Sequence, residues 1–218
     1  MVSYNKAKAL IEQWRYKYNI SDTLKLFVEN WAYLHTGMYK PSSSIIEESD
    51  FTSVAIPLSH ELSIMMNQGE SDPLAVLLSE YCKESNKHLG YYPSPKELGN
   101  LIFGLLGGDW KIAQGQKLSI SEPCCGTAGL IMQKVERIAE ANAAKNNPLE
   151  GVSIYVEDIN DIAAHAFFIQ FIHKMQYLEG VLGKKTMPDR VVIQQLNTLS
   201  RVKGRVSYTL SSPSLLGI

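Results

Sequence analysis

The chain is organised around the stretch Leu118-Ser-Ile-Ser-Glu-Pro-Cys-Cys-Gly-Thr-Ala-Gly-Leu-Ile-Met132. Apolar and polar residues alternate over its first four positions, a pattern typical of a half-buried strand. Small residues follow, and apolar residues then recur at helical spacing as far as Ile138. A strand that enters a helix through a tight turn offers backbone N–H groups to a ligand at the helix N-terminus. We therefore expect the turn to bind a ligand, with Glu122 facing a positively charged group of that ligand.

The composition is that of an ordinary globular protein. Of the 218 residues, 45% are hydrophobic and 20% are charged, which suits one good-sized α/β domain or a smaller domain with an accessory segment. The net charge of −1 excludes a global basic field, so DNA contact would depend on local patches or on a partner subunit. Two of the three cysteines are adjacent, which favours a reducing compartment over a disulfide framework. The apolar runs are too short for a membrane span, and the N-terminus lacks the apolar core of a signal peptide, so we expect a cytoplasmic protein.

The pattern of the chain changes near its middle. Apolar residues at helical spacing predict helices over residues 6–18, 23–35, 58–67, 73–84 and 95–106. Strands predicted at 117–121, 152–156, 191–193 and 206–210 then alternate with helices at 129–144 and 160–178. Such alternation predicts a parallel sheet with right-handed crossovers and a ligand at the carboxyl ends of its strands. We therefore divide the chain into a helical N-terminal region, residues 1–88, and an α/β domain, residues 89–218.

Capping residues predict where several helices begin and end. We expect Ser21 to be the N-cap of the second helix and Gly37 to end it. Asp72 and Pro73 are typical of the N-cap and first position of a helix. Pro57 is expected to interrupt helical structure before residue 58.

Three segments carry candidate chemistry, and each also has a plain structural interpretation. The turn at 122–129 departs from GxGxxG and lacks the Gly-Lys-Ser/Thr of a phosphate loop, so it is equally explained as a tight crossover. Asp158 follows the second strand and would accept hydrogen bonds from ribose hydroxyls. It is also explained as a solvated acid, or as a competitor of Asn160 for the cap of the next helix. Residues 91–95, Tyr-Tyr-Pro-Ser-Pro, are also typical of a helix start.

Taken together, these segments resemble a known family. Glu-Pro-Cys-Cys-Gly-Thr-Ala-Gly at 122–129 is similar to the Asp-Pro-x-Cys-Gly-Thr-Gly-Gly motif of adenine-N6 DNA methyltransferases, above all in the modification subunit of type I restriction systems. Residues 91–95 resemble the family's Phe-Tyr-Thr-Pro segment, residues 155–160 its Tyr-Gly-x-Glu-Ile-Asn stretch, and residues 196–199 its Gly-Asp-Thr-Leu stretch. The resemblance implies an α/β, Rossmann-like S-adenosylmethionine-dependent methyltransferase fold preceded by a helical N-terminal region.

The resemblance also implies a cofactor and its site. The cofactor would be S-adenosylmethionine or S-adenosylhomocysteine, with Asp158 on the ribose and Asn197, in place of the family's usual acid, bordering the adenine. The implied cofactor-binding residues are Tyr92, Ser94, Pro95, Glu122, Pro123, Cys124, Gly126, Thr127, Ala128, Gly129, Asp158, Ile159 and Asn197.

The expected catalytic motif is degenerate. The family uses Asn-Pro-Pro-Tyr/Phe after the fourth strand, where the Asn and the first Pro carbonyl accept hydrogen bonds from the target amine and the aromatic ring stacks on a flipped base. The matching residues here are Ser212, Pro213, Ser214 and Leu215. A serine hydroxyl is shorter than a carboxamide and leucine has no stacking face, so each lost contact would cost about 1–3 kcal/mol in the transition state.

Two functions follow as hypotheses. The first is an S-adenosylmethionine-binding, adenine-N6 DNA methyltransferase-like protein that transfers a methyl group directly to the amine. The second is a catalytically inactive relative that acts as a regulatory or anti-restriction decoy subunit. Because the family's sheet continues beyond a fourth strand, we expect a partner subunit or a second copy to cover an open sheet edge here. An unrelated nucleotide-binding α/β protein is a third, weaker interpretation.

Other reactive residues have simpler explanations. His165 and His173 lie on one predicted helix among phenylalanines, which favours core or interface histidines over metal ligands. Cys124 and Cys125 have no evident His/Asp partner, so we assign them packing or backbone roles. Basic loop residues, which would contact phosphate or simply be solvated, are Lys184, Lys185, Arg190, Arg201, Lys203 and Arg205.

Overall fold

The computed structural model describes residues 4–82, 94–106 and 110–212 and has an α/β architecture. Its elements in chain order are α1 (Asn5–Glu12), η1 (Gln13–Tyr16), α2 (Ile20–Thr36), η2 (Ser44–Glu47), α3 (Ser49–Asn67), α4 (Pro73–Tyr81), α5 (Lys96–Leu106), β1 (Leu118–Pro123), α6 (Gly129–Ala141), β2 (Val152–Asp158), α7 (Asp161–Leu182), β3 (Arg190–Leu196) and β4 (Lys203–Ser211). The expected division near residue 88 lies outside the described residues. Among the described helices, none is both long enough and apolar enough for a membrane crossing.

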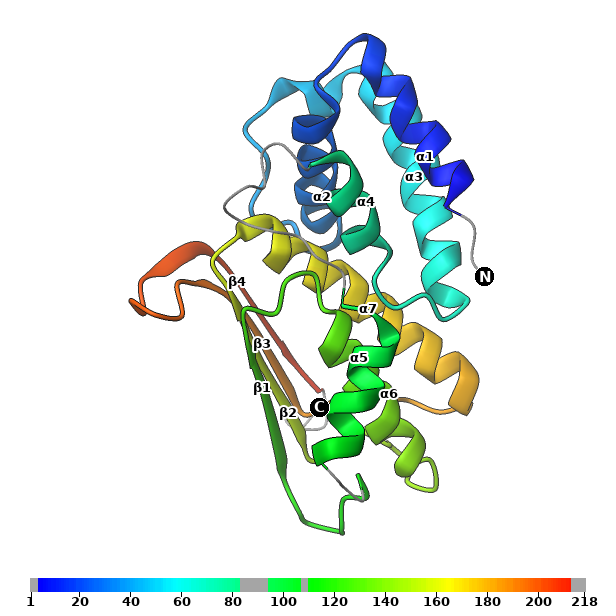
Figure 1. The fold of residues 1–218 in the computed structure, drawn as a ribbon, viewed down its shortest axis with the longest axis vertical. Coiled ribbons are helices and arrows are strands. Elements are labelled where there is room, and N and C mark those ends of the chain that lie inside the picture. The colour runs from blue at the N-terminus through cyan, green and yellow to red at the C-terminus, as the bar shows by residue number, and fades with distance from the viewer. Residues whose placement is uncertain (1–3, 83–93, 107–109, 213–218) are drawn as a thin grey trace.

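The sheet has the strand order β1-β2-β3-β4, and its first three strands are parallel. Ile120 lies opposite Ile154, and Ile154 lies opposite Val191, so one row of buried side chains crosses all three strands. Helices α6 and α7 provide the two crossovers, and both lie with α5 on one face of the sheet (Figure 1). The predicted parallel core of the α/β domain is therefore confirmed for these strands, with the carboxyl ends of β1 and β2 at the same edge.

The fourth strand corrects the prediction of a wholly parallel sheet. β4 pairs with β3 in the antiparallel direction, with Val191 opposite Leu210 and Ile193 opposite Tyr208. Only residues 197–202 join the two strands. A parallel strand would need a crossover of about a dozen residues or more, so this short link allows only a hairpin.

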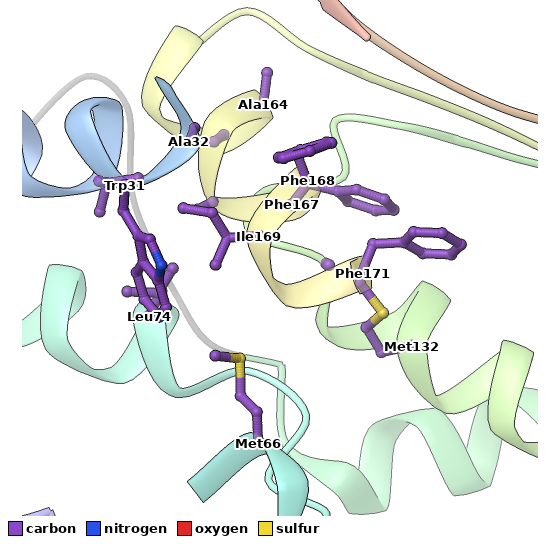
Figure 2. Close-up of a cluster of buried hydrophobic side chains, with 14 of the residues drawn as sticks. Trp31, Ala32, Met66, Leu74, Met132, Ala164, Phe167, Phe168, Ile169 and Phe171 are labelled. Carbon is purple, nitrogen blue, oxygen red and sulfur yellow. The ribbon is translucent and has the colours of Figure 1, made fainter. Parts of the chain in front are cut away.

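Helix α7 forms the centre of the molecule. It is buried almost all round, because one side contacts β2, β3 and β4 and the other contacts α2 and α3. Figure 2 shows Phe167 and Phe171 directed away from the N-terminal helices, while Ile169 lies on the side of Trp31. A single hydrophobic cluster therefore runs from the N-terminal helices through α7 to the sheet.

The helix boundaries confirm some capping predictions and correct others. Asp72 is the N-cap of α4 with Pro73 at its first position, and Gly37 ends α2 with a left-handed backbone. The N-cap of α2 is Asn19 rather than Ser21, because the Asn19 side chain accepts a hydrogen bond from the Asp22 amide. Contrary to the prediction, Pro57 does not interrupt the helix but lies inside α3.

The apolar stripe predicted for α5 is only partly buried. Leu101 and Leu105 are 59% and 78% exposed, and Leu98 is also exposed. The buried side chain is Phe103, whose ring packs edge-on against Trp110 and lies beneath the Arg137 guanidinium. α5 packs against α6, and the described residues do not cover its leucine side.

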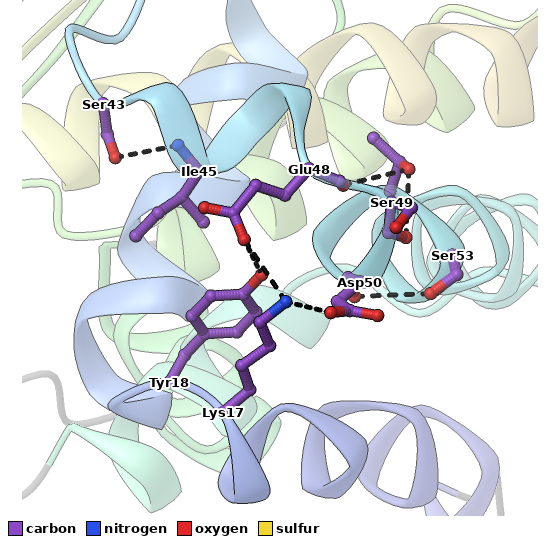
Figure 3. A network of polar contacts seen from close by, with 9 residues as sticks. Lys17, Tyr18, Ser43, Ile45, Glu48, Ser49, Asp50 and Ser53 are labelled. Carbon is purple, nitrogen blue, oxygen red and sulfur yellow. Dashed lines mark hydrogen bonds and ion pairs between the residues drawn. The ribbon is translucent and has the colours of Figure 1, made fainter.

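A polar network holds the start of α2 to the start of α3 (Figure 3). The Tyr18 hydroxyl donates to Glu48 at 2.7 Å, and Lys17 forms ion pairs with Glu48 and Asp50. These charges are exposed and screened by solvent, so the ion pairs add little stability and serve mainly to order the helix junction.

Candidate functional site

The site is the turn between β1 and α6, which is tied to the end of β2. The Cys125 amide donates to the Glu157 carbonyl at 2.9 Å, and the Gly126 amide donates to Asp158 Oδ2 at 2.8 Å. Cys124, Gly126 and Ala128 all have positive φ. The backbone therefore reverses sharply just before α6, as predicted from the small residues of this stretch.

Ala128 adopts a backbone conformation that favours glycine. It is the N-cap of α6, with φ 116° and ψ 4°, and it is fully buried. A Cβ in this region of φ is strained. The motif that this stretch resembles has glycine here, so the chain carries alanine at a position whose backbone favours glycine.

Glu122 is an enclosed acid at the end of β1. Burial raises its pKa to about 7, against the opposing effects of the Ile131 backbone and Lys134. Its Oε2 atom is buried and meets no hydrogen-bond donor among the described residues. A buried carboxylate without a partner is costly, and a cationic ligand group would supply that partner.

Asp158 helps to build the turn. Its Oδ2 accepts from the Gly126 amide and its Oδ1 from the Asn160 amide at 2.9 Å. Asn160 caps α7 through the Ile162 amide, so the alternative that Asp158 is the cap does not hold. Each carboxylate oxygen has a second lone pair, which leaves Asp158 able to accept hydrogen bonds from ligand hydroxyls. Ile159, the next residue, is 52% exposed.

The segment before α5 reaches the start of α6. A Cβ added to Gly129 would lie 3.9 Å from the Ser94 Cβ and 3.0 Å from Asp72 Oδ2. Pro95 follows and accepts the first backbone hydrogen bonds of α5. The structure therefore brings Ser94 beside the turn, whereas Tyr92 lies outside the described residues.

Asn197 begins the β3–β4 hairpin. Its side-chain oxygen accepts from the amides of Leu199 and Ser200, at 3.1 Å and 3.0 Å. The next residue, Thr198, approaches Cys124, with 3.9 Å between Oγ1 and Sγ. The hairpin thus starts beside the turn. The carboxamide oxygen of Asn197 accepts its hydrogen bonds from amides within the hairpin.

The structure does not bring Ser212 to the turn. Because β4 is antiparallel, its last residue, Ser211, lies opposite Arg190 at the beginning of β3. Ser212 is buried there, and its amide donates to the Asp189 carbonyl at 3.0 Å. Asp158, by contrast, lies level with Gln195 near the other end of β3. The remaining catalytic candidates, Pro213, Ser214 and Leu215, lie outside the described residues.

Two residues of the site were not predicted from the sequence. Asp72 Oδ1 accepts from Thr127 Oγ1 at 2.7 Å and from Gln170 Nε2 at 2.9 Å, and Gln170 Nε2 also donates to the Thr127 carbonyl at 2.5 Å. Burial raises the pKa of Asp72, while its hydrogen bonds lower it. The signal for Gln170 was a lone amide within an apolar helical run.

Two of the predicted basic residues, and both histidines of α7, have structural partners. Arg201 makes a two-bond ion pair with Glu157 at 2.7 Å and 2.9 Å, and Lys184 donates to the Ala143 carbonyl at 2.7 Å. His165 contacts the Tyr208 hydroxyl at 2.6 Å. His173 lies 3.4 Å from Ser63 Oγ at the interface of α7 with α3. No group of three metal-ligating side chains is present in the described part of the chain.

Comparison with known families places the chain beside the N-6 DNA methylases. The model of the N-6 DNA methylase family matches residues 71–181, just over half of the 218 residues. The matched region begins beside Asp72 and contains the turn, Asp158 and nearly all of α7. Neither the curated proteins nor the solved structures contain a match to the chain.

Proposed function

Because the chain belongs to the N-6 DNA methylase family, we propose that it binds S-adenosylmethionine or S-adenosylhomocysteine in the turn between β1 and α6, as an adenine-N6 DNA methyltransferase-like protein. The observation that carries the proposal is the buried Glu122 oxygen without a donor, at the place where the cofactor's ammonium group would bind.

The other residues of the turn suit the remaining parts of the cofactor. Gly126 and Gly129 keep the backbone free of side chains, so N–H groups at the start of α6 can approach the ligand. Asp158 retains acceptor capacity for ribose hydroxyls, and Ile159 offers an exposed apolar side chain to the adenine. The bound cofactor supplies a methyl group on a sulfonium, and these residues would orient it rather than react with it.

Titration calorimetry on the whole chain tests cofactor binding. We expect heat with both cofactors, and at least a tenfold weaker affinity for Glu122→Gln, because the neutral amide lacks the charge that pairs with the ammonium. The control is Glu150→Gln, which changes the same residue type in the loop before β2. No heat from a folded sample with either cofactor would contradict the proposal.

The direction of β4 favours a second candidate, a catalytically inactive relative with a regulatory or decoy role. Ser212 lies at the opposite end of the sheet strands from Asp158, so its hydroxyl is not placed beside the turn. Incubation with adenine-containing DNA and cofactor labelled in the methyl group distinguishes the candidates. Labelled N6-methyladenine would exclude the inactive relative. Cofactor binding without labelled DNA, even with a co-purified partner, would support it.

We also propose that a partner protein or a second copy of the chain covers the open sheet edge, and that DNA is contacted mainly through this partner. β4, where the open edge is expected, and β1 are the two terminal strands of the described sheet, and the exposed leucines of α5 add uncovered apolar surface. Light scattering of the pure chain at rising concentration tests self-association, with Leu101→Asp as the variant expected to weaken it. A monomer at every concentration would contradict the second copy and leave the partner protein as the proposal.

A further inference from the structure

We propose that Asp72, together with Gln170, positions the cofactor turn and links it to the N-terminal helices. The inference rests on the proposed function, because it concerns how the same turn is held in a binding shape. Asp72 comes from the start of α4 and Gln170 from the middle of α7, so neither belongs to the strand–turn–helix segment. Both residues hydrogen-bond to Thr127, so they can act on the cofactor through the turn without touching it.

The first half of this arrangement satisfies the N-terminus of α4. Pro73 has no N–H, the Leu74 amide donates to Gln170 Oε1 at 3.0 Å, and the Ala75 amide donates to Asp72 Oδ1 at 3.3 Å. The first free amides of α4 therefore have acceptors from two different elements. Moving α4 would break bonds to α7 as well as its own cap.

The second half holds Thr127 from two directions. Its hydroxyl donates to Asp72 Oδ1, and its carbonyl accepts from Gln170 Nε2. Thr127 is 3% exposed and Gln170 is 1% exposed, so water does not replace these bonds readily. Because Gly126 is held by Asp158 on one side of Thr127, the peptide groups facing the ligand have a fixed direction.

The geometry assigns Asp72 a positioning role rather than direct ligand binding. All three hydrogen bonds to its carboxylate end on Oδ1. The other oxygen lies so close to Gly129 that a Cβ added there would be 3.0 Å away. An asparagine keeps an Oδ1 acceptor and is as good an N-cap as aspartate, so it should replace Asp72 in this role. A direct ionic contact with the cofactor would not survive that change.

The arrangement predicts a reciprocal effect. If the turn binds the cofactor better when α4 is docked, then the bound cofactor must stabilise the docking of α4 by the same factor. Amide hydrogen exchange of α4 should therefore slow when S-adenosylhomocysteine is added, although α4 belongs to the N-terminal helices.

The test measures S-adenosylhomocysteine affinity by calorimetry and turn order by hydrogen exchange in the full chain. We expect Asp72→Ala and Thr127→Val to weaken binding about tenfold, the effect of losing one or two buried hydrogen bonds. Asp72→Asn should bind within about threefold of wild type. In the absence of cofactor, Asp72→Ala should speed exchange of the Cys125, Gly126 and Ala128 amides, which are hydrogen-bonded in the turn.

Asn142→Ala is the matched control. The Asn142 side chain is also buried and makes three hydrogen bonds, to the Ile112 amide and to the carbonyls of Trp110 and Ile138. It lies at the far end of α6, so its loss should lower the unfolding midpoint without changing cofactor affinity or exchange in the turn.

Each result decides the inference. Equal loss of affinity in Asp72→Asn and Asp72→Ala would overturn it, because binding would then depend on the negative charge of Asp72 rather than on its hydrogen bonds. Wild-type affinity in both Asp72→Ala and Thr127→Val would overturn it while leaving cofactor binding intact. If the wild type binds neither cofactor, the proposed function fails, and exchange in the free protein still decides the matter: unchanged turn amides in Asp72→Ala would exclude a positioning role.

Discussion

At the scale of single residues, the site is shaped by the burial of Glu122. An acid with a buried, unpartnered oxygen lowers the stability of the free protein, and such local cost is common where a charged ligand binds. The sequence places this acid at the end of a strand. Its enclosure depends on the helix that follows and on residues far away in the chain.

Glu122→Gln should stabilise the free protein at pH 8 by about 1–3 kcal/mol. The folded pKa of about 7 lies above the ordinary value of 4.5, so the folded state keeps the proton more tightly. The free energy of unfolding of the wild type therefore falls as pH rises from about 4.5 to about 7. The glutamine of the variant does not titrate, so the variant does not lose this stability. Urea unfolding at pH 5 and pH 8 measures the difference, which should shrink toward pH 5. A variant no more stable than wild type at pH 8 would contradict this account.

Ala128→Gly should cost much less stability than Ala139→Gly. Both alanines are fully buried, but Ala139 is inside α6 and Ala128 has φ 116° at the helix N-cap. Both substitutions remove a buried methyl group and lose its hydrophobic stabilisation. Glycine relieves backbone strain only at position 128. We expect the free energies of unfolding of the two variants to differ by about 1–2 kcal/mol in urea titrations. Equal losses would show that the turn is unstrained.

At the scale of elements, local patterns predicted most helices and strands, and the errors have identifiable causes. The helix over α3 was expected to begin after Pro57 because proline removes a backbone donor. Tertiary packing overrode that signal, since Phe51, Val54, Leu58 and Leu62 form one buried stripe on both sides of the proline. The α5 helix was predicted correctly, but spacing identifies its apolar residues and not what covers them, and Leu101 and Leu105 are exposed.

Pro57→Ala should stabilise the protein by about 1–2 kcal/mol, because alanine restores a helical hydrogen bond to the Ser53 carbonyl. The gain is reduced by the greater freedom that alanine gives the unfolded chain. Thermal melting measures it, and Pro73→Ala is the control. Pro73 occupies the first position of α4, where no hydrogen bond is gained. A loss of stability in Pro57→Ala would mean that α3 depends on a local bend at the proline.

At the scale of the whole molecule, α7 joins the sheet to the N-terminal helices through buried histidines. His173 packs against Trp31 and His35 of α2, and His165 packs against Tyr39 and Tyr208. Burial lowers the pKa of each of these α7 histidines to about 4. These groups must stay neutral for the two halves of the protein to remain packed.

Acid should therefore loosen the molecule between pH 6.5 and pH 4. Since the unfolded histidines bind protons first, stability falls as pH drops through this range, by about 1–2 kcal/mol per histidine between pH 7 and pH 5. The measurement is urea unfolding at these two pH values in a Glu122→Gln background, which removes the opposite titration of that acid. Adding His173→Gln should flatten the dependence, and an unchanged slope would contradict the assignment.

Much of the cofactor site was predictable because it is contiguous. Glu122, the small-residue turn and the helix after it lie within one stretch, and Asp158 follows at the spacing of one βαβ unit. Asp72 and Gln170 were not predictable as site residues. They are 98 positions apart and meet only because the start of α4 contacts the middle of α7.

The sequence by itself determined the local features of this protein: its strand–turn–helix stretch, the cap of α4, and its family through motif order. Those features depend on near neighbours in the chain, where spacing and side-chain chemistry act directly. Only the tertiary structure decided the direction of β4, the distance of Ser212 from the turn, and the contact of Asp72 and Gln170 with Thr127. These depend on long-range packing around α7, which no local pattern contains.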